Sequence, residues 1–582
     1  MAKKKGLFAG IKDGIDKSVT RQKRKVYTDA LVERGLKVVR EIDNGSRQAV
    51  ILQYRLLLDL LKENKDTEYG KKYDFANIRT IDQFREKVPF VEYDDLQPFI
   101  HRMMAGEKDV LCSEPPKYYA MTTGSIGVPK HIPVSERELK KYTKYSVAMA
   151  FGVAEEYYRD TTGMGVPVGP GLNAVEMKMT ETKTGVEKGS ISATLMKSVK
   201  EVVPYLMSSP WEIVCPGKEM DLKYLKTRLA LQCKDLAFMD SVFLSGLVDL
   251  MDYIQDNHKM LCDDICNGTI NESVEVPDDI RELLASQIQP DPERAEVLRR
   301  EFAEGFDTPI IPRIWPRMSW IGGIGTGAFF PYVRRMRSYS GKSIPFNNLC
   351  YAASESFMAV SRHMGDTSYV LIPDGGFYEF IPVKGEDETK TLLLNELEIG
   401  EDYEVVVTNL SGFYRYKIHD VVKVTGYYNE TPILKFVYRR NQLISLAGEK
   451  TSEEAVRWAI EVFAREAKVD VNDYSIYADR TVSPPHYTML VEPSKIVPKE
   501  RIDFCRDILE RCLIHANPTY SEALRNGSLG KLYLVFLQQE TYRLYRDMMI
   551  MKGTSSNQLK PVRVIDSPMK EKFFFELRER YE

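Results

Sequence analysis

The stretch from Thr122 to Lys130 reads T-T-G-S-I-G-V-P-K and combines hydroxyl side chains, two glycines and a closing lysine. Glycine tolerates positive φ and lets backbone N–H groups approach an anion, while hydroxyls and a lysine add donors and charge. A strand-like run, Lys117 to Met121, precedes the loop, and Ser135 and Glu138 follow it at the spacing of a helix capping box. This order of strand, glycine-rich loop and helix predicts a loop that wraps a polyphosphate. A surface turn rich in small residues is the alternative interpretation of the stretch alone.

Length and charge restrict the class of protein. A chain of 582 residues exceeds what one hydrophobic core usually serves, so two or more domains are expected. Lys and Arg number 81 against 84 Asp and Glu, a formal net charge of −3. That balance provides no overall positive field for nucleic acid, and any anion site must be local.

The eight cysteines and the apolar runs point to a cytoplasmic protein. Cys262 and Cys266 are separated by three residues and have no second pair at zinc-ligand spacing, so reduced thiols are expected. The chain has no uncharged run of eighteen residues, the length that a membrane span requires, and no secretory core near its N-terminus. We expect a soluble, cytoplasmic monomer.

Residues 1–28 form a basic leader with apolar residues at helical spacing, among them Leu7, Phe8 and Ile11. Such a segment is able to touch anionic lipid. A solvated leader is the favoured interpretation, because Asp13 and Asp16 interrupt the charge and the apolar face is short.

The pattern beyond the leader predicts an α/β protein of two domains. Helical periodicity in 222–233 and 295–303 alternates with β-rich runs in 211–214 and 403–407, which favours layered sheets and helices. We expect a large domain over 29–438. Residues 439–582 have their own alternation of strands and helices and predict a smaller α+β domain.

Two further segments accompany the loop. Tyr351 to Glu355 follows a short apolar run, and Tyr414 to Asp420 precedes a clear strand, Val421 to Thr425. With the loop, they resemble in order and wording the adenylate-forming enzymes, the superfamily of acyl-CoA synthetases and luciferase. Within it, the chain resembles the auxin-responsive Gretchen Hagen family of acyl acid amido synthetases from about residue 50 onward. The segments that carry this resemblance are Ile314-Trp315-Pro316, Thr326-Gly327, Pro331-Tyr332, Tyr351 to Glu355, Tyr414-Arg415-Tyr416 and Val424-Thr425-Gly426-Tyr427.

The resemblance implies a fold, a reaction and a nucleotide site. The C-terminal domain becomes a lid over the large ATP-binding domain, and the reaction joins a small carboxylic acid to an amino acid through an acyl-adenylate. ATP and Mg²⁺ are the implied cofactors, with Glu355 as a metal ligand. Asp420 suits the ribose because a carboxylate accepts short charge-assisted hydrogen bonds from sugar hydroxyls. The expected nucleotide-binding residues are Thr122, Thr123, Gly124, Ser125, Gly127, Lys130, Tyr351, Ala352, Ala353, Ser354, Glu355, Tyr414, Asp420 and Arg439.

Lys560 is the expected catalytic residue. The segment Ser556 to Arg563 resembles the family segment that carries the lid lysine, whose point charge would meet the carboxylate oxygen and the α-phosphate. The expected acyl-binding residues are Ser245, Thr326, Gly327 and Phe357.

Two positions depart from the family pattern. Ile126 replaces a small hydroxyl residue of the loop, and His419 stands where Gly is usual, so its imidazole is expected to narrow the ribose pocket. Two other functions stay open: a ligase that forms a thioester with CoA or a carrier protein, and a non-catalytic nucleotide sensor or lipid-associated scaffold.

Overall fold

The computed structural model describes residues 2–122, 130–175, 177, 179–384, 389–440, 446–447, 449, 451–554 and 559–581, with the backbone alone for 2–19 and 198. Among these residues the α-helices are, in chain order, α1 Ala2–Gly45, α2 Ala49–Asn64, α3 Glu68–Lys72, α4 Ile81–Lys87, α5 Tyr93–Met104, α6 Glu136–Thr143, α7 Met149–Thr162, α8 Ile191–Ser198, α9 Val203–Leu206, α10 Trp211–Val214, α11 Leu222–Gln232, α12 Leu244–Asn267, α13 Asp278–Gln287, α14 Pro292–Ala303, α15 Ile311–Ile314, α16 Phe330–Ser340, α17 Glu453–Glu466, α18 Ile502–Ala516, α19 Pro518–Arg525, α20 Thr541–Met551 and α21 Pro568–Glu576. None of the described helices is long and apolar enough to cross a membrane.

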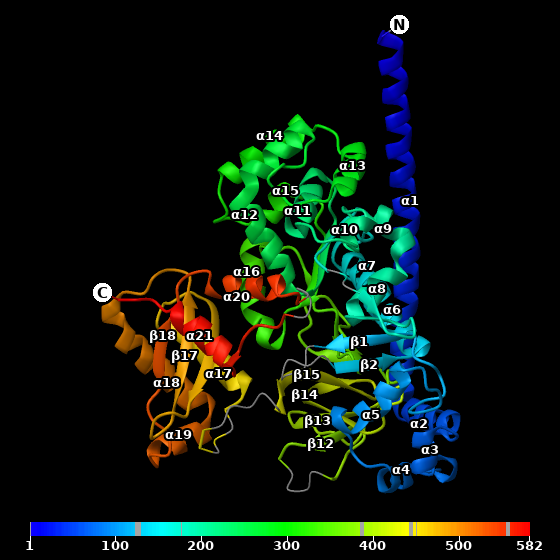
Figure 1. Ribbon diagram of the computed structural model, residues 1–582, viewed down its shortest axis with the longest axis vertical. Helices are drawn as coiled ribbons and strands as arrows, with labels where there is room; N and C mark the ends of the chain where they lie inside the picture. The colour runs from blue at the N-terminus through cyan, green and yellow to red at the C-terminus, as the bar shows by residue number, and fades with distance from the viewer. Residues whose placement is uncertain are drawn as a thin grey trace.

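A seven-stranded antiparallel sheet forms the centre of the large domain (Figure 1). Its strand order is β12-β13-β14-β15-β11-β10-β9. The strands are β9 Cys350–Ala352, β10 Phe357–Val360, β11 Tyr369–Leu371, β12 Phe377–Pro382, β13 Asp402–Thr408, β14 Tyr416–Tyr428 and β15 Thr431–Arg439.

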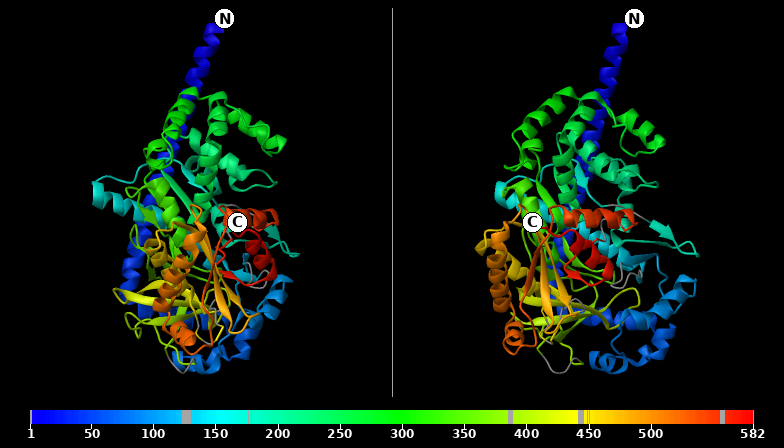
Figure 2. Two further views of the ribbon diagram at one scale, coloured as in Figure 1. Left: turned by 90° about the vertical axis from the view of Figure 1, so that its left-hand side faces the viewer. Right: turned by 60° about the vertical axis from the view of Figure 1, so that its left-hand side comes forward.

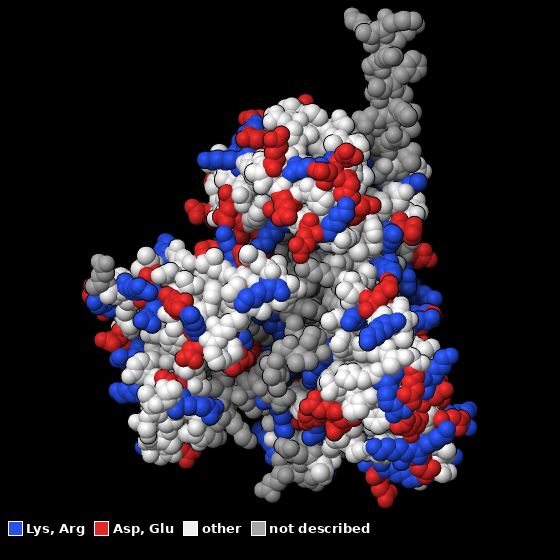
Figure 3. Space-filling model, viewed as in Figure 1, with Lys and Arg blue, Asp and Glu red and all other residues white. Residues whose placement is uncertain are grey.

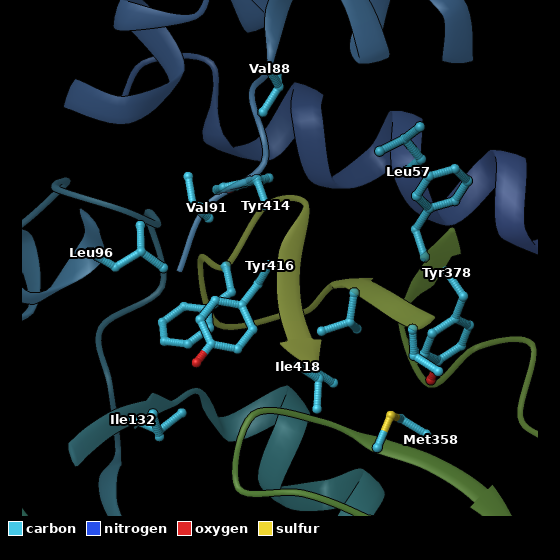
Figure 4. Close-up of a cluster of buried hydrophobic side chains, with 14 of the residues drawn as sticks. Leu57, Val88, Val91, Leu96, Ile132, Met358, Tyr378, Tyr414, Tyr416 and Ile418 are labelled. Carbon is cyan, nitrogen blue, oxygen red and sulfur yellow. The ribbon is translucent and has the colours of Figure 1, made fainter. Parts of the chain in front are cut away.

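Apolar side chains cover both faces of this sheet. Along β11, Tyr369 and Leu371 pack toward α2 and α5, whereas Val370 and Ile372 pack toward α1 and α7. This alternation is the two-residue period of a strand buried on both faces. Figure 4 shows the first of these cores, with Leu57 of α2 near the strands and Tyr416 and Ile418 along β14.

Two smaller sheets complete the large domain. A parallel sheet in the order β3-β6-β7-β8 lies against α11, α12 and α14, and an antiparallel and parallel sheet follows the order β2-β1-β5-β4. Their strands are β1 Tyr118–Thr122, β2 Lys130–Val134, β3 Gly171–Asn173, β4 Met179–Glu181, β5 Glu187–Gly189, β6 Phe238–Phe243, β7 Trp320–Ile324 and β8 Phe346–Asn347. Since β3, β6, β7 and β8 are parallel, their carboxyl ends meet at one edge, the usual place for ligands in such sheets.

Helices α1 and α7 cross at two glycines. A Cβ atom built on Gly35 would lie 2.3 Å from the carbonyl oxygen of Ala148 and 2.4 Å from the backbone nitrogen of Gly152. Only glycine lets the two backbones approach so closely. The contact fixes α1 on the outer layer of the central sheet, and α1 continues without a break across the predicted boundary between residues 28 and 29.

The C-terminal domain has a sheet in the order β18-β17-β16-β19 with helices on both faces (Figure 2). Its strands are β16 Val471–Asp479, β17 His486–Pro493, β18 Tyr533–Phe536 and β19 Val564–Ile565. In β17, Met489 and Val491 pack toward α17 to α19, whereas Leu490 packs toward α20 and α21. These separate cores support an independent unit, which lies beside the large domain in Figure 1.

Most of the predicted elements are confirmed, and one is wrong. The helices over 222–233 and 295–303 correspond to α11 and α14, and Ser135 caps α6 by accepting from the backbone N–H of Glu138. The predicted β-run Trp211 to Val214 is the helix α10 instead. The carbonyl oxygen of Pro210 accepts from the N–H groups of Ile213 and Val214, so local turn bonds decided the conformation of this short run.

Leu57→Ala is expected to destabilise the large domain by about 2–5 kcal/mol, because Leu57 is fully buried on α2 and truncation leaves a cavity. The midpoint of urea unfolding measures the loss. Ile51→Ala on the same helix is the control, since Ile51 is 51% exposed and its truncation should change the midpoint little. Equal shifts for both variants would contradict this description of the core.

Candidate active site

Asp420 lies on β14 with both carboxylate oxygens held. Arg439 Nε donates to Oδ1 over 2.6 Å, and the Tyr351 hydroxyl donates to Oδ2 over 3.0 Å. Asp420 and Arg439 are opposite residues in the β14–β15 register, so the pairing of two strands places them together. Burial and the neighbouring Asp420 carboxylate raise the pKa of Tyr351 well above its ordinary value, which keeps its donor proton in place. Asp420 itself raises the pKa of the Arg439 guanidinium.

Glu355 sits in the turn between β9 and β10. The Tyr416 hydroxyl donates to its Oε1 over 3.4 Å, and Asn409 Nδ2 donates to its backbone oxygen over 2.6 Å. The turn closes by a bond from the backbone nitrogen of Ala353 to the carbonyl oxygen of Ser356. Burial and then the Glu355 carboxylate raise the pKa of Tyr416, so this phenol remains a donor. Glu355 is only partly buried and has room for a further ligand.

The two ends of the glycine-rich loop, Thr122 and Lys130, lie near the Glu355 carboxylate. Thr122 and Lys130 are paired residues of β1 and β2, and Lys130 Nζ lies 5.0 Å from the centre of the Tyr93 ring. The nearby Glu355 charge contributes to a raised pKa of Tyr93, after burial and Asp94. Thr123, Gly124, Ser125, Ile126 and Gly127 lie outside the described residues, so the loop contacts themselves stay predictions.

Lys560 comes from the C-terminal domain and faces the carboxylates of the large domain. The Lys560 side chain is exposed to solvent. Protein atoms nevertheless surround it and replace part of its hydration shell. This desolvation lowers the pKa of the ammonium, and Arg439 lowers it further. Three carboxylates raise this pKa instead, those of Asp420, Glu355 and Glu453. The lysine thus shares one electrostatic environment with Glu355 and Asp420.

His419 adopts a left-handed backbone with φ of 66°, a conformation that favours glycine. Its ring contacts two carboxylates: Nδ1 lies 3.1 Å from Glu404 Oε1 and Nε2 lies 3.2 Å from Glu92 Oε1. Arg440 lies 3.1 Å from the other oxygen of Glu404. Two carboxylates therefore hold the imidazole that replaces the family's usual glycine.

Thr326 and Gly327 follow β7 of the parallel sheet and lie beside the Asp420 cluster. Thr326 Oγ1 is 3.1 Å from the Tyr369 hydroxyl, and a Cβ atom on Gly327 would meet the Phe436 ring at 3.3 Å. Tyr351 lies next to both rings, with centroids 6.3 and 6.1 Å away. The predicted acyl segment is thus a neighbour of the Asp420 cluster.

Five other predicted residues lie in the core or in the Glu355 turn. Tyr414 is turned into the core, where it stacks on Tyr69 at 5.3 Å and donates to the carbonyl oxygen of Leu111. Phe357 is buried against Tyr142. Ser245 is buried in the first turn of α12, and Ala352 packs toward α1 and α7. The Ser354 side chain is partly exposed in the Glu355 turn.

Three residues of the site were missed by the sequence analysis. Tyr416 was quoted within a motif but not assigned, and it is the phenol that donates to Glu355. Figure 4 shows its ring on β14. Tyr93 and Tyr369 have no sequence signal, because an isolated tyrosine far from any motif resembles an ordinary core residue. Strand alternation after Tyr414 was the one available signal for Tyr416.

The donor set fits a magnesium ion bound mainly by substrate. Among the described residues no cluster of three or more His, Cys, Asp or Glu side chains could hold a metal. Mg²⁺ in nucleotide sites usually takes one or two carboxylates together with phosphate oxygens and water. Glu355, a partly buried carboxylate whose Oε1 accepts from Tyr416, meets that requirement. The acidic and basic side chains on the face in Figure 3 are interspersed, which agrees with a local anion site rather than a charged surface.

Family models match almost the whole described chain. The GH3 family N-terminal domain matches residues 38–346, the central domain 369–439 and the C-terminal domain 454–569. The chain belongs to the GH3 family. The resemblance to the Gretchen Hagen enzymes is thereby confirmed, and so is the predicted fold class of mixed helices and sheets.

Curated GH3 relatives cover nearly the same length. The chain is 31% identical over 569 residues to indole-3-acetic acid-amido synthetase GH3.8 of Oryza sativa subsp. indica, covering 93% of this chain and 92% of the relative. It is 28% identical over 554 residues to jasmonoyl–L-amino acid synthetase JAR6 of Nicotiana attenuata, covering 91% and 93%. The solved structure of GH3.15 acyl acid amido synthetase has the same fold, with a TM-score of 0.81, 24% identity and coverage of 92% and 95%.

Asp420→Ala is expected to weaken ATP binding by about 1.5–3 kcal/mol, or about 10- to 150-fold in Kd, the range for hydrogen bonds to a charged group. Isothermal titration calorimetry measures the change. Asp402→Ala is the control, because Asp402, the first residue of β13, pairs with Lys423 Nζ of β14 at 2.7 Å, a comparable carboxylate bond in the same sheet. Unchanged ATP affinity in a folded Asp420→Ala variant would refute the ribose assignment.

Proposed function

We propose that this GH3 protein is an ATP-dependent acyl acid amido synthetase. The observation that supports it best is that Glu355, Asp420 and Lys560, from three distant parts of the sequence, lie close enough for their charges to interact. An ATP α-phosphate beside a carboxylic acid concentrates negative charge, and the lysine and Arg439 are placed to offset it. The relatives' amide-forming activities agree with this use of the site.

The first half-reaction makes an acyl-adenylate. A carboxylate oxygen of the acid attacks the α-phosphorus, the bond to the bridging oxygen breaks, and pyrophosphate leaves with the electron pair. Lys560 places its ammonium beside the attacking and phosphate oxygens, while Asp420 orients the ribose. In the second half-reaction the amine of an amino acid attacks the acyl carbon, the bond to AMP breaks, and the nitrogen gives up a proton.

The remaining nucleotide contacts belong to the same proposal. The loop with Thr122, Thr123, Gly124, Ser125, Gly127 and Lys130 would hold the β- and γ-phosphates through N–H groups and hydroxyls. Glu355 would bind Mg²⁺, which when present neutralises phosphate charge. Thr326 and Gly327, next to the cluster, are proposed to border the acyl group, with Ser245 and Phe357 behind them.

The organisation of the chain follows the same proposal. We propose that the boundary between the domains lies between residues 438 and 439, at the end of β15. Residues 439–582 then act as a lid over residues 29–438. A cytoplasmic location and a monomeric state belong to the same proposal. The expectation of a solvated leader over residues 1–28 is wrong for its last residues, because Arg24 Nε donates to the carbonyl oxygen of Tyr205 over 2.7 Å and Thr28 is buried.

The acid is proposed to be a small, largely apolar carboxylic acid. Indole-3-acetic acid and jasmonic acid, which the names of the relatives give, are the first probes. Acid-dependent exchange of labelled pyrophosphate into ATP tests the proposal, followed by mass spectrometry of products formed with mixed amino acids or with CoA. Exchange and an amide product support it. A CoA thioester would indicate a thioester ligase, and ATP binding without exchange for any acid would indicate a sensor.

Lys560→Ala is expected to slow pyrophosphate exchange by about 10²–10³, the scale for losing one preorganised electrostatic partner. ATP affinity should change far less, because the ammonium meets charge that develops during the reaction. Lys572→Ala, an exposed lysine of α21, is the matched control. A Lys560→Ala variant with normal exchange would exclude this lysine as the catalytic residue.

The exchange rate is expected to fall at alkaline pH as Lys560 loses its proton. Desolvation and Arg439 lower the pKa of its ammonium, so the charged form disappears at lower pH than for a free lysine. Lys560→Arg keeps a positive charge throughout this range and should move the alkaline limb to higher pH, even if its maximum rate is lower. Identical alkaline limbs for the two proteins would show that another group sets the profile.

A further inference from the structure

Arg563 joins the C-terminal domain to the segment that follows β7. Its side chain is 5% exposed, and its Nη2 donates to the carbonyl oxygen of Ala328 in the large domain over 2.6 Å. Its Nη1 donates to the carbonyl oxygen of Tyr474 over 2.7 Å and to Asp473 Oδ1 over 2.5 Å. Ala328 follows Gly327 directly, so the arginine reaches the segment that lies beside the Asp420 cluster.

Asp473 receives a second bond from the large domain. The hydroxyl of Tyr332, near the start of α16, donates to Asp473 Oδ2 over 3.0 Å. Burial is the main cause that raises the pKa of Tyr332 well above its ordinary value, and Asp473 adds to it, so this hydroxyl stays protonated. Arg563, Asp473 and Tyr332 thus form one buried network across the interface between the domains.

The network is connected rigidly to Lys560. Arg563 precedes β19, whose Val564 pairs with Ile476 of β16, and the backbone nitrogen of Ile476 donates to the Arg563 oxygen over 2.9 Å. Ser475 Oγ donates to the backbone oxygen of Val562. Only Pro561 and Val562 separate Lys560 from Arg563, so the position of the arginine limits where the lysine lies.

The ion pairs between the domains differ in their exposure to solvent. Arg543 with Asp256 and Lys223 with Asp547 have side chains 31–47% exposed, so solvent weakens them. Arg546 with Asp249 is a buried pair, with side chains 10% and 14% exposed. The Arg563 network adds two further bonds between the domains, from Arg563 to Ala328 and from Tyr332 to Asp473. Of these contacts, the Arg563 network is the one closest in sequence to Lys560.

We propose that Arg563, with Asp473 and Tyr332, is a positioning group for acyl-adenylate formation: it fastens the C-terminal domain to Ala328 and so holds Lys560 over Glu355 and Asp420. This inference rests on the proposed function. Since amide formation uses an acyl-adenylate already made, a loosened network should slow the first half-reaction and spare the second.

The test compares Tyr332→Phe and Arg563→Lys with the wild type in both half-reactions. Pyrophosphate exchange with indole-3-acetic acid, or the most active acid of the screen, is expected to fall about 10- to 100-fold in kcat with little change in the KM for ATP. The rate of amide formation from the chemically prepared adenylate of the same acid and mixed amino acids should stay within about twofold of the wild-type rate. This step follows acyl-adenylate formation, which is the step that depends on the position of Lys560. Tyr332→Phe keeps the ring and removes one hydroxyl, so folding should be preserved.

Matched controls remove comparable bonds elsewhere. Tyr158→Phe loses a hydrogen bond of 3.0 Å to the carbonyl oxygen of Ser319, and Arg281→Lys loses bonds to carbonyl oxygens near Ile270. Both lie in the large domain and should leave exchange unchanged. Equal losses in both half-reactions, or losses as large in the controls, would overturn the positioning role.

A structural readout separates this inference from the proposed function. Hydrogen–deuterium exchange of peptides spanning 324–332 should become several-fold faster in Tyr332→Phe and Arg563→Lys, because the C-terminal domain covers this segment less often. Unchanged exchange would overturn the inference whatever the activity. Absence of pyrophosphate exchange in the wild type for every acid would instead contradict the proposed function, and the deuterium result would still decide the contact.

Discussion

The ion pair of Asp420 with Arg439 is the interaction on which the site depends. It joins opposite residues of β14 and β15 over 2.6 Å, with Asp420 buried and its second oxygen bonded to Tyr351. A buried carboxylate needs such partners, since an unpaired charge in the interior costs several kcal/mol. Because β15 ends at Arg439, the same bond that orients the carboxylate also fixes the point where the chain leaves the large domain. Arg440 adds a second anchor at Glu404.

The geometry of the site follows from how carboxylates and cations are divided between the two domains. The large domain contributes Glu355 and Asp420, Arg439 is the last residue of β15 at the boundary between the domains, and the C-terminal domain contributes Lys560. A lysine on a separate body approaches or leaves as that body turns, without rearrangement of the sheet that holds the carboxylates. Contacts between the domains therefore affect where Lys560 lies relative to Glu355 and Asp420, whereas a core contact within either domain would not.

His419 shows how the chain holds a residue other than glycine in a left-handed conformation. A left-handed backbone at this position is easy for glycine and costs about 1–2 kcal/mol for other residues. Its ring lies between Glu404 and Glu92, and these contacts offset part of that cost. The imidazole is therefore held by neighbouring carboxylates next to Asp420, an arrangement that the sequence position alone did not indicate.

The sequence by itself determined the local elements and the family. Strand alternation and helical periodicity are properties of neighbouring residues, so α11, α14, β13 and the elements of the C-terminal domain could be predicted, as could the grouping of Glu355, Asp420 and Lys560 through their motifs. Trp211 to Val214 could not, because four apolar residues fit a strand or a helical turn equally well. Tertiary structure alone decided that Tyr416 rather than Tyr414 faces Glu355, that Tyr369 borders Thr326, and that Arg563 reaches Ala328. Those contacts join residues far apart in the chain, and their partners are selected by packing between sheets and domains, which no local pattern encodes.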